Sequence, residues 1–127
     1  MIGVDVSAAS LALAGAAGCY EELLQVDLAS GLPFDDSAFG ALVCGGVLTY
    51  VAEPEPVLSE FVRVVRNGGV VVFSQRTDLW AERGVDEVLD RIRAQGHRIE
   101  TGPPVPYLPD LAEYGTEIEV IFTTIEV

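Results

Sequence analysis

The feature that most constrains this chain is its opening segment, residues 2–7, in which a short apolar run ends in the carboxylate of Asp5. The alanine-rich stretch that follows, residues 8–17, predicts a helix. In an open α/β sheet, ligands bind beyond the carboxyl ends of the strands, where a carboxylate accepts hydrogen bonds from ribose hydroxyls. Asp5 is therefore a candidate nucleoside ligand. The alternative is that Asp5 and Ser7 only form the turn and the N-cap of the helix.

Strand-like and helix-like segments alternate through the rest of the chain. Strands are expected at 22–26, 39–46, 70–73, 97–101 and 117–126, and helices at 53–66 and 85–95. The glycines of Asn67-Gly68-Gly69 are expected to end the first of these two helices. The alternation predicts an α/β protein of one domain, residues 1–127. Its sheet is expected to be mostly parallel, with helices on both faces and an antiparallel strand pair at the C-terminal end.

Composition limits the classes of partner. The 127 residues contain 20 Asp and Glu against 7 Lys and Arg, which gives a net charge of −13. Such a field repels nucleic acid and anionic membrane surfaces. Neither Cys19 nor Cys44 belongs to a disulfide framework or a metal motif, and the carboxylates lack metal-ligand spacing. With no membrane-spanning run and no signal peptide, the sequence predicts a soluble, cytoplasmic protein.

Further candidate ligand residues follow the second and third predicted strands. Asp27 stands at the tip of the second strand, where its alternative role is to cap a turn. Cys44 and Gly45 end the third strand. The alternatives there are a buried small apolar residue and a tight turn.

Other polar and aromatic residues are candidates for an acceptor pocket above the sheet, but half-buried packing is the alternative for the aromatic ones. They are Tyr50, Arg76, Trp80 and Tyr107. The single histidine, His97, follows a helix stop and is expected to have a surface or capping role rather than that of a general base.

The order of these signals resembles class I S-adenosylmethionine-dependent methyltransferases. Within that class, the chain most resembles the methyltransferase-like proteins of the Williams–Beuren syndrome chromosomal region. The likeness covers roughly residues 1–80, with a weaker likeness to the end of the chain, and the most specific piece is the helix and glycine turn at 58–69. The segments that carry it are 3–7 with Leu11 and Ala12, 24–27, 32–39, 46–48, 58–69, 70–77 and 105–107.

The resemblance implies a Rossmann-like methyltransferase fold and S-adenosylmethionine as cofactor. It implies that Asp5, beside Ser7, binds the ribose hydroxyls, and that Asp27 and Leu28 meet the adenine. Cys44 and Gly45 would lie beside the methionine portion. The implied reaction is direct methyl transfer to a small-molecule or protein acceptor, which depends on alignment more than on catalytic side chains.

The sequence departs from the family pattern in two places. Gly40 stands where the family has a carboxylate, and only four residues precede Asp5, although the family's glycine-rich loop lies about 20 residues before this acid. The resemblance therefore predicts a domain without its first strand, a fragment in which two interior strands expose unpaired edges and methyl transfer is impaired.

Two other functions are compatible with an acid at a strand tip. One is a non-catalytic pseudo-methyltransferase that serves as a binding or regulatory module. The other is half of a nicotinamide-dependent oxidoreductase. Asp27 and the glycine turn at residues 67–69 argue against the oxidoreductase.

Overall fold

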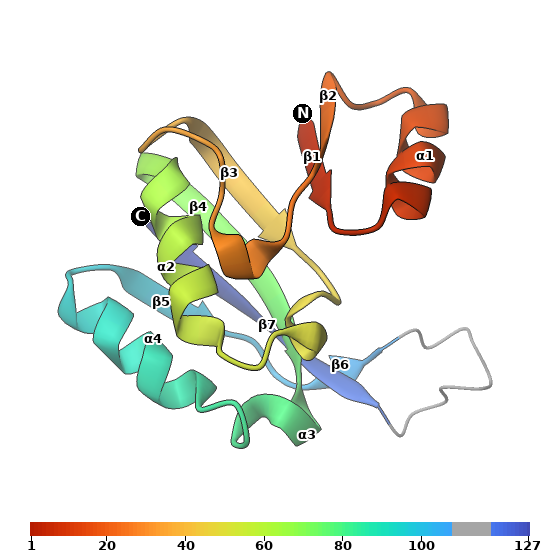
Figure 1. Ribbon diagram of the computed structural model, residues 1–127. Helices are drawn as coiled ribbons and strands as arrows, with labels where there is room; N and C mark the ends of the chain where they lie inside the picture. Colours follow the sequence, from red (N-terminus) through yellow and green to blue (C-terminus); the bar gives the residue numbers. More distant parts are fainter. Residues whose placement is uncertain (108–117) are drawn as a thin grey trace. The chain divides into compact units, whose positions relative to one another are not determined.

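The computed structural model describes residues 1–107 and 118–127 (Figure 1). The chain divides into two compact units, Met1–Pro33 and Phe34–Val127, which we call unit 1 and unit 2. Among the described residues, no helix has both the length and the apolar character needed to cross a membrane.

Unit 1 is a strand–helix–strand element. It consists of β1 (Ile2–Asp5), α1 (Ala8–Ala17), β2 (Glu22–Gln25) and the short 3-10 helix η1 (Leu28–Ser30). The two strands are parallel, with Ile2 opposite Glu22 and Asp5 opposite Gln25, and α1 packs against both. The predicted helix at 8–17 is confirmed, whereas the second strand ends one residue earlier than expected.

Gly3 is needed for the packing of unit 1. A Cβ atom at this position would lie 2.7 Å from the side chain of Leu23 and 2.8 Å from that of Tyr20. Real Cβ atoms do not approach other heavy atoms so closely, so any larger residue would force the side chains of Leu23 and Tyr20 to move.

Unit 2 contains the larger sheet. The chain order of its elements is β3 (Phe39–Cys44), η2 (Leu48–Tyr50), α2 (Pro54–Val64), β4 (Val65–Arg76), α3 (Thr77–Trp80), α4 (Val85–Ala94), β5 (Arg98–Thr101), β6 (Val105–Pro106) and β7 (Glu119–Glu126). The strand order is β3-β4-β7-β5, and β6 also pairs with β7. β3 and β4 are parallel, while β7 is antiparallel to β4, β5 and β6. The predicted antiparallel arrangement at the C-terminal end is confirmed; Glu117, included in the expected last strand, lies outside the described residues.

The core of unit 2 lies between the sheet and the helices α2 and α4, which cover the same face in Figure 1. Helical spacing gives each helix one apolar stripe, and both stripes are buried. On the sheet, alternate residues of β4 and β7 point to the helices, because successive side chains of a strand lie on opposite faces. The buried apolar residues of these four elements include Val57, Leu58, Phe61, Val71, Phe73, Val88, Leu89, Ile92 and Ile125.

The end of α2 differs from the sequence expectation. The helix stops at Val64, and residues 67–69, expected to be its terminating turn, belong to β4. The backbone explains this difference, since Gly68 N–H donates to the carbonyl of Val127 (2.7 Å) and Val127 N–H donates to the carbonyl of Gly69 (3.0 Å). These bonds to the far end of the chain favour a strand over a helical turn.

The same segment contains an irregularity in the β3–β4 ladder. Phe39 pairs with Val65, but the next pair is Ala41 with Val70, so the register between β3 and β4 shifts. Gly68 has φ +87°, and a Cβ on Gly69 would lie 2.5 Å from the carbonyl oxygen of Gly40. The glycines therefore allow the register of β4 against β3 to shift without a steric clash.

In the part of the chain that the structure describes, β1 pairs with β2 alone and β3 with β4 alone. Each of β1 and β3 thus has one edge without a ladder partner among these residues. Unpaired strand edges are sites of further pairing, which is the property that the sequence led us to expect of these two strands.

Thr123 lies in the core of unit 2 with 0% of its surface exposed, and its hydroxyl has no hydrogen-bond partner among the described residues. We expect Thr123→Val to stabilise the protein by about 1 kcal/mol, because it removes a buried unsatisfied group at nearly constant shape. Urea unfolding followed by circular dichroism measures this difference. Thr124→Val is the matched control, since Thr124 is only half-buried; an equal gain in both variants would contradict the explanation.

Candidate functional site

Asp5 is the last residue of β1 and is half-buried. Its Oδ1 accepts a hydrogen bond from the backbone N–H of Ser7 at 2.9 Å. Ser7 is the N-cap of α1, and its Oγ accepts from Ser10 N–H at 3.2 Å. The hydroxyl of Ser7 therefore caps the helix, as the alternative interpretation expected. The Asp5 carboxylate is held by one oxygen, and no described residue donates a hydrogen bond to the other.

Asp27 has the same local geometry at the end of β2. It is the N-cap of η1, and its Oδ1 accepts from Ala29 N–H at 3.0 Å. Leu28, the first residue of η1, is half-buried. Asp5 is paired with Gln25, and Asp27 comes two residues after Gln25 in the parallel partner strand. The two aspartates therefore lie at the same end of the unit 1 sheet, where both strands finish.

A side-chain bond ties the two strand ends together. Gln25 Nε2 donates to the carbonyl of Val6 at 3.0 Å, which links the last residue of β2 to the residue after Asp5. A cavity of about 330 Å³ lies beside the end of β2. Its size is at the lower end of the range for small-molecule pockets. It is lined by Gln25, Val26, Asp27, Ser30, Gly31, Leu32 and Pro33.

Cys44 and Gly45 lie in unit 2, at the C-terminal end of β3. Cys44 is buried, and burial raises the pKa of its thiol to about 11. It is therefore protonated near neutral pH and is not a nucleophile. Gly45 is exposed, and no atom lies within 4 Å of the position where its Cβ would stand. The contact of these two residues with the methionine portion of a cofactor stays a prediction.

Gly46, the next residue, is fixed more tightly. It has φ +72°, and its N–H donates to Oγ of Ser74 at 3.0 Å. A Cβ here would also lie 3.1 Å from the hydroxyl oxygen of Tyr107. Gly46 thus provides a turn that residues with a side chain adopt only with strain.

Two buried polar residues near this turn escaped the sequence interpretation, Ser74 and Gln75. Gln75 is 1% exposed; its Nε2 donates to the carbonyl of Leu48 (3.2 Å), and its Oε1 accepts from the N–H of Arg76 (2.8 Å). Ser74 and Gln75 extend β4 beyond its apolar run, whereas the sequence predicted that the strand ends at residue 73. The signal that identifies them is a pair of polar residues directly after a buried parallel strand.

Arg76 ends β4 and forms a two-bond ion pair with Asp78, with Nε–Oδ1 at 3.0 Å and Nη2–Oδ2 at 2.6 Å. This pair raises the pKa of the Arg76 guanidinium and lowers the pKa of the Asp78 carboxyl. The phenols of Tyr107 and Tyr50 also raise the pKa of Arg76, which places both near its charge. Three of the four residues suggested for an acceptor pocket therefore share one end of the sheet.

The fourth residue has a packing role. Trp80 is buried in α3, and its Nε1 donates to Oδ1 of Asp86 at 2.9 Å. His97 precedes β5, and β5 runs in the same direction as β4 because both are antiparallel to β7. His97 therefore lies at the opposite end of the sheet from Arg76. Among the described residues, no group of three or more His, Cys, Asp or Glu side chains is arranged to hold a metal ion.

Comparison with known proteins identifies the family. Residues 1–73, more than half of the chain, match the family described as methyltransferase domain, and the chain belongs to that family. No curated protein sequence matches.

Solved structures with the same fold include S-adenosylmethionine-dependent methyltransferases of Mesorhizobium loti and Thermotoga maritima. The former is 19% identical, with a TM-score of 0.73 over 99% of this chain and 79% of that one. The latter is 16% identical, with a TM-score of 0.70 over 98% of this chain and 72% of that one. A third, the [4+2]-cyclase SpnF, is 21% identical, with a TM-score of 0.72 over 98% of this chain and 64% of that one. The Rossmann-like methyltransferase fold expected from the sequence is confirmed.

The burial of Cys44 leads to a testable difference between the two cysteines. Cys19 is exposed, whereas Cys44 is buried with a pKa of about 11. At pH 8 only about one Cys44 thiol in a thousand is ionised. We expect iodoacetamide to modify Cys19 and to leave Cys44 unmodified until urea unfolds the protein, as followed by peptide mass spectrometry. Equal rates at both positions in the folded protein would contradict this assignment.

Proposed function

We propose that this chain acts as an S-adenosylmethionine-dependent methyltransferase, with Asp5 binding the ribose hydroxyls and Asp27 the exocyclic amine of adenine. One observation carries the proposal. Both aspartates stand at the C-terminal ends of adjacent parallel strands, and a backbone N–H holds one oxygen of each. Neither carboxylate receives a second hydrogen bond from a described residue.

The donor set of unit 1 fits the adenosine portion of such a cofactor. A carboxylate accepts two O–H bonds side by side, which suits a ribose diol, and the cavity beside Asp27 offers backbone groups and apolar surface to a flat ring. The net charge of −13 attracts a sulfonium cation. When bound, the cofactor supplies a methyl group on a positively charged sulfur.

The acceptor is either a small molecule or a protein, and we assign no catalytic side chain, because direct methyl transfer depends mainly on alignment of donor and acceptor. Membership of the methyltransferase domain family supports the reaction class. The closer likeness to the methyltransferase-like proteins of the Williams–Beuren region is part of the proposal and rests on the sequence motifs. Since the same fold also serves a cyclase, fold alone does not decide the reaction.

Calorimetric titration with S-adenosylhomocysteine tests the proposed cofactor site. We expect Asp5→Asn to raise the Kd about 10-fold to 100-fold, because hydrogen bonds to a charged group contribute about 1.5–3 kcal/mol. Asparagine still accepts the bond from Ser7 N–H, so the turn is preserved. We expect a smaller increase, about threefold, for Asp27→Asn, since its amide oxygen remains an acceptor for an amine.

Asp35→Asn is the matched control, because Asp35 is exposed, lies in unit 2 and undergoes the same change of charge. Its Kd should equal that of the wild type. An unchanged Kd in Asp5→Asn would remove the ribose role from Asp5. Lack of binding by the wild-type chain at millimolar S-adenosylhomocysteine would refute the proposed function for this chain.

Transfer itself is tested with tritiated S-adenosylmethionine and a panel of one amine, one thiol, one phenol, one carboxylic acid and one unstructured peptide. We expect label to move to at least one acceptor class, and Asp5→Asn to lower that rate at subsaturating cofactor by the same factor as it raises the Kd. Tight binding of S-adenosylhomocysteine without transfer to any acceptor would instead indicate a binding module.

A further inference from the structure

The loop that follows β3 presents an aromatic side chain to solvent. The loop, residues 45–51, contains η2, whose turns are closed by bonds from Tyr50 N–H to Val47 O and from Val51 N–H to Leu48 O, both at 3.0 Å. Tyr50 is 87% exposed. Its phenol lies near the charge of Arg76, at the C-terminal end of β4. The ring thus lies above the end of the sheet where an α/β protein binds its ligands.

Three polar side chains from later in the chain hold this loop. Ser74 accepts the N–H of Gly46 at 3.0 Å, and Gln75 donates to the carbonyl of Leu48 at 3.2 Å. Arg83 donates to two further carbonyls, those of Thr49 (Nη2, 3.2 Å) and Val51 (Nη1). The first two side chains belong to the buried strand β4, whereas Arg83 comes from the connection between α3 and α4.

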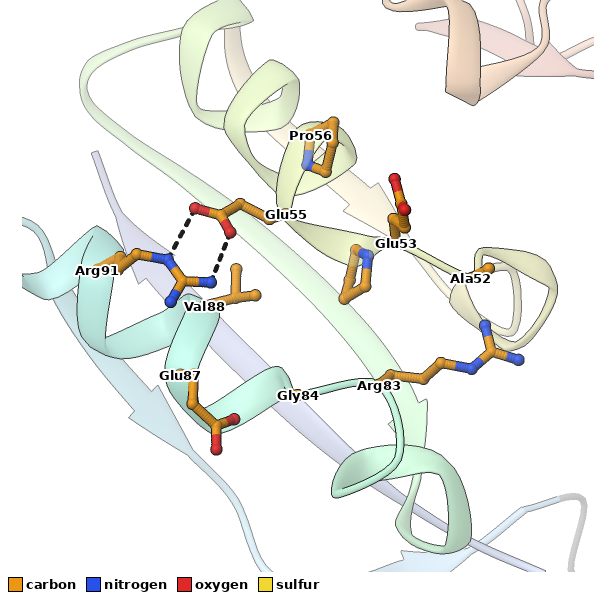
Figure 2. Close-up of a pocket in the computed structure, with 10 residues that line it drawn as sticks. Ala52, Glu53, Glu55, Pro56, Arg83, Gly84, Glu87, Val88 and Arg91 are labelled. Carbon is orange, nitrogen blue, oxygen red and sulfur yellow. Dashed lines mark hydrogen bonds and ion pairs between the residues drawn. The ribbon is translucent and has the colours of Figure 1, made fainter.

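Arg83 is the contact that brackets Tyr50. The carbonyls that it binds belong to the residues immediately before and after the tyrosine. Only a guanidinium presents several N–H groups in a rigid, planar fork, and it binds two carbonyls at once without losing its charge. Figure 2 shows Arg83 extending away from the nearby ion pair of Glu55 and Arg91. The Arg83 side chain therefore donates to the 45–51 loop and takes no part in the ion pair of Glu55 and Arg91.

We propose that Arg83 is a positioning residue that fixes the 45–51 loop and holds the ring of Tyr50 at the C-terminal end of the unit 2 sheet, where the ring contacts the methyl acceptor. The inference rests on the proposed function for the identity of that acceptor. The positioning itself rests on the two carbonyl bonds, on the buried bonds of Ser74 and Gln75 at the base of the loop, and on the exposure of Tyr50. Arg83 acts through the loop and touches no reacting atom.

Amide hydrogen exchange on the full chain tests the proposal. We expect Arg83→Ala to accelerate exchange at Tyr50 and Val51 at least tenfold, while the amides of the β4–β7 ladder change by less than twofold. Arg83→Lys should restore part of the protection, since an ammonium reaches one carbonyl but lacks the fork. Arg91→Ala is the matched control. It removes an arginine that, together with Arg83, lines a pocket of about 440 Å³ (Figure 2), and exchange at Tyr50 and Val51 should stay within twofold of the wild type.

A spectroscopic signal separates positioning from general stability. With 3-fluorotyrosine in place of tyrosine, the resonance of Tyr50, assigned by Tyr50→Phe, should shift or broaden in Arg83→Ala while the resonance of Tyr20 stays in place. Unchanged exchange at Tyr50 and Val51, or a uniform increase across the whole chain, would overturn the proposal. A wild-type chain that does not bind S-adenosylhomocysteine would refute the proposed function without changing these loop measurements, so the two failures are distinguishable.

Discussion

Unit 2 depends on β4, which, like β7, is hydrogen-bonded along both of its edges. It pairs in parallel with β3 on one side and antiparallel with β7 on the other. Because its residues alternate between two faces, Val71, Phe73 and Gln75 all point to the face covered by α2. The same strand therefore supplies the apolar floor of the core and, at its C-terminal end, the polar groups that fix the loop after β3.

The side chains of β4 change from apolar to polar toward its C-terminal end, and burying the polar ones costs free energy unless they form hydrogen bonds. A buried amide such as that of Gln75 is unfavourable unless its hydrogen bonds are made. Gln75 makes bonds with both ends of its amide, one to the carbonyl of Leu48 and one from the N–H of Arg76. The bond to Leu48 joins the loop after β3 to the interior strand β4, and the fully buried side chain of Leu48 anchors the same loop in the core. Arg83 adds a second support from the helical side of the same loop.

The sequence predicted those elements whose signal is local. The helix at 8–17, the buried stripes of α2 and α4, and the antiparallel β7 follow from periodicity and from turn residues, and all were found. The extent of β4 was not predicted. Asn67-Gly68-Gly69 is a good helix terminator locally, but its backbone groups bond to Val127, almost sixty residues later. The bracketing of Tyr50 by Arg83 was missed for the same reason, because a contact across more than thirty residues leaves no local pattern.

The two aspartates of unit 1 show that structural and functional interpretations of one residue are compatible. The sequence offered turn formation and ligand binding as alternatives for Asp5 and Asp27, and the structure shows the turn role for both. A carboxylate has two oxygens, however, and the turn occupies one of them. The bond to the backbone fixes the torsion of the side chain, so less conformational entropy is lost when the second oxygen binds a hydroxyl or an amine. Turn formation thus prepares the carboxylate for a ligand, and its occurrence at both strand ends is an argument for the proposed site.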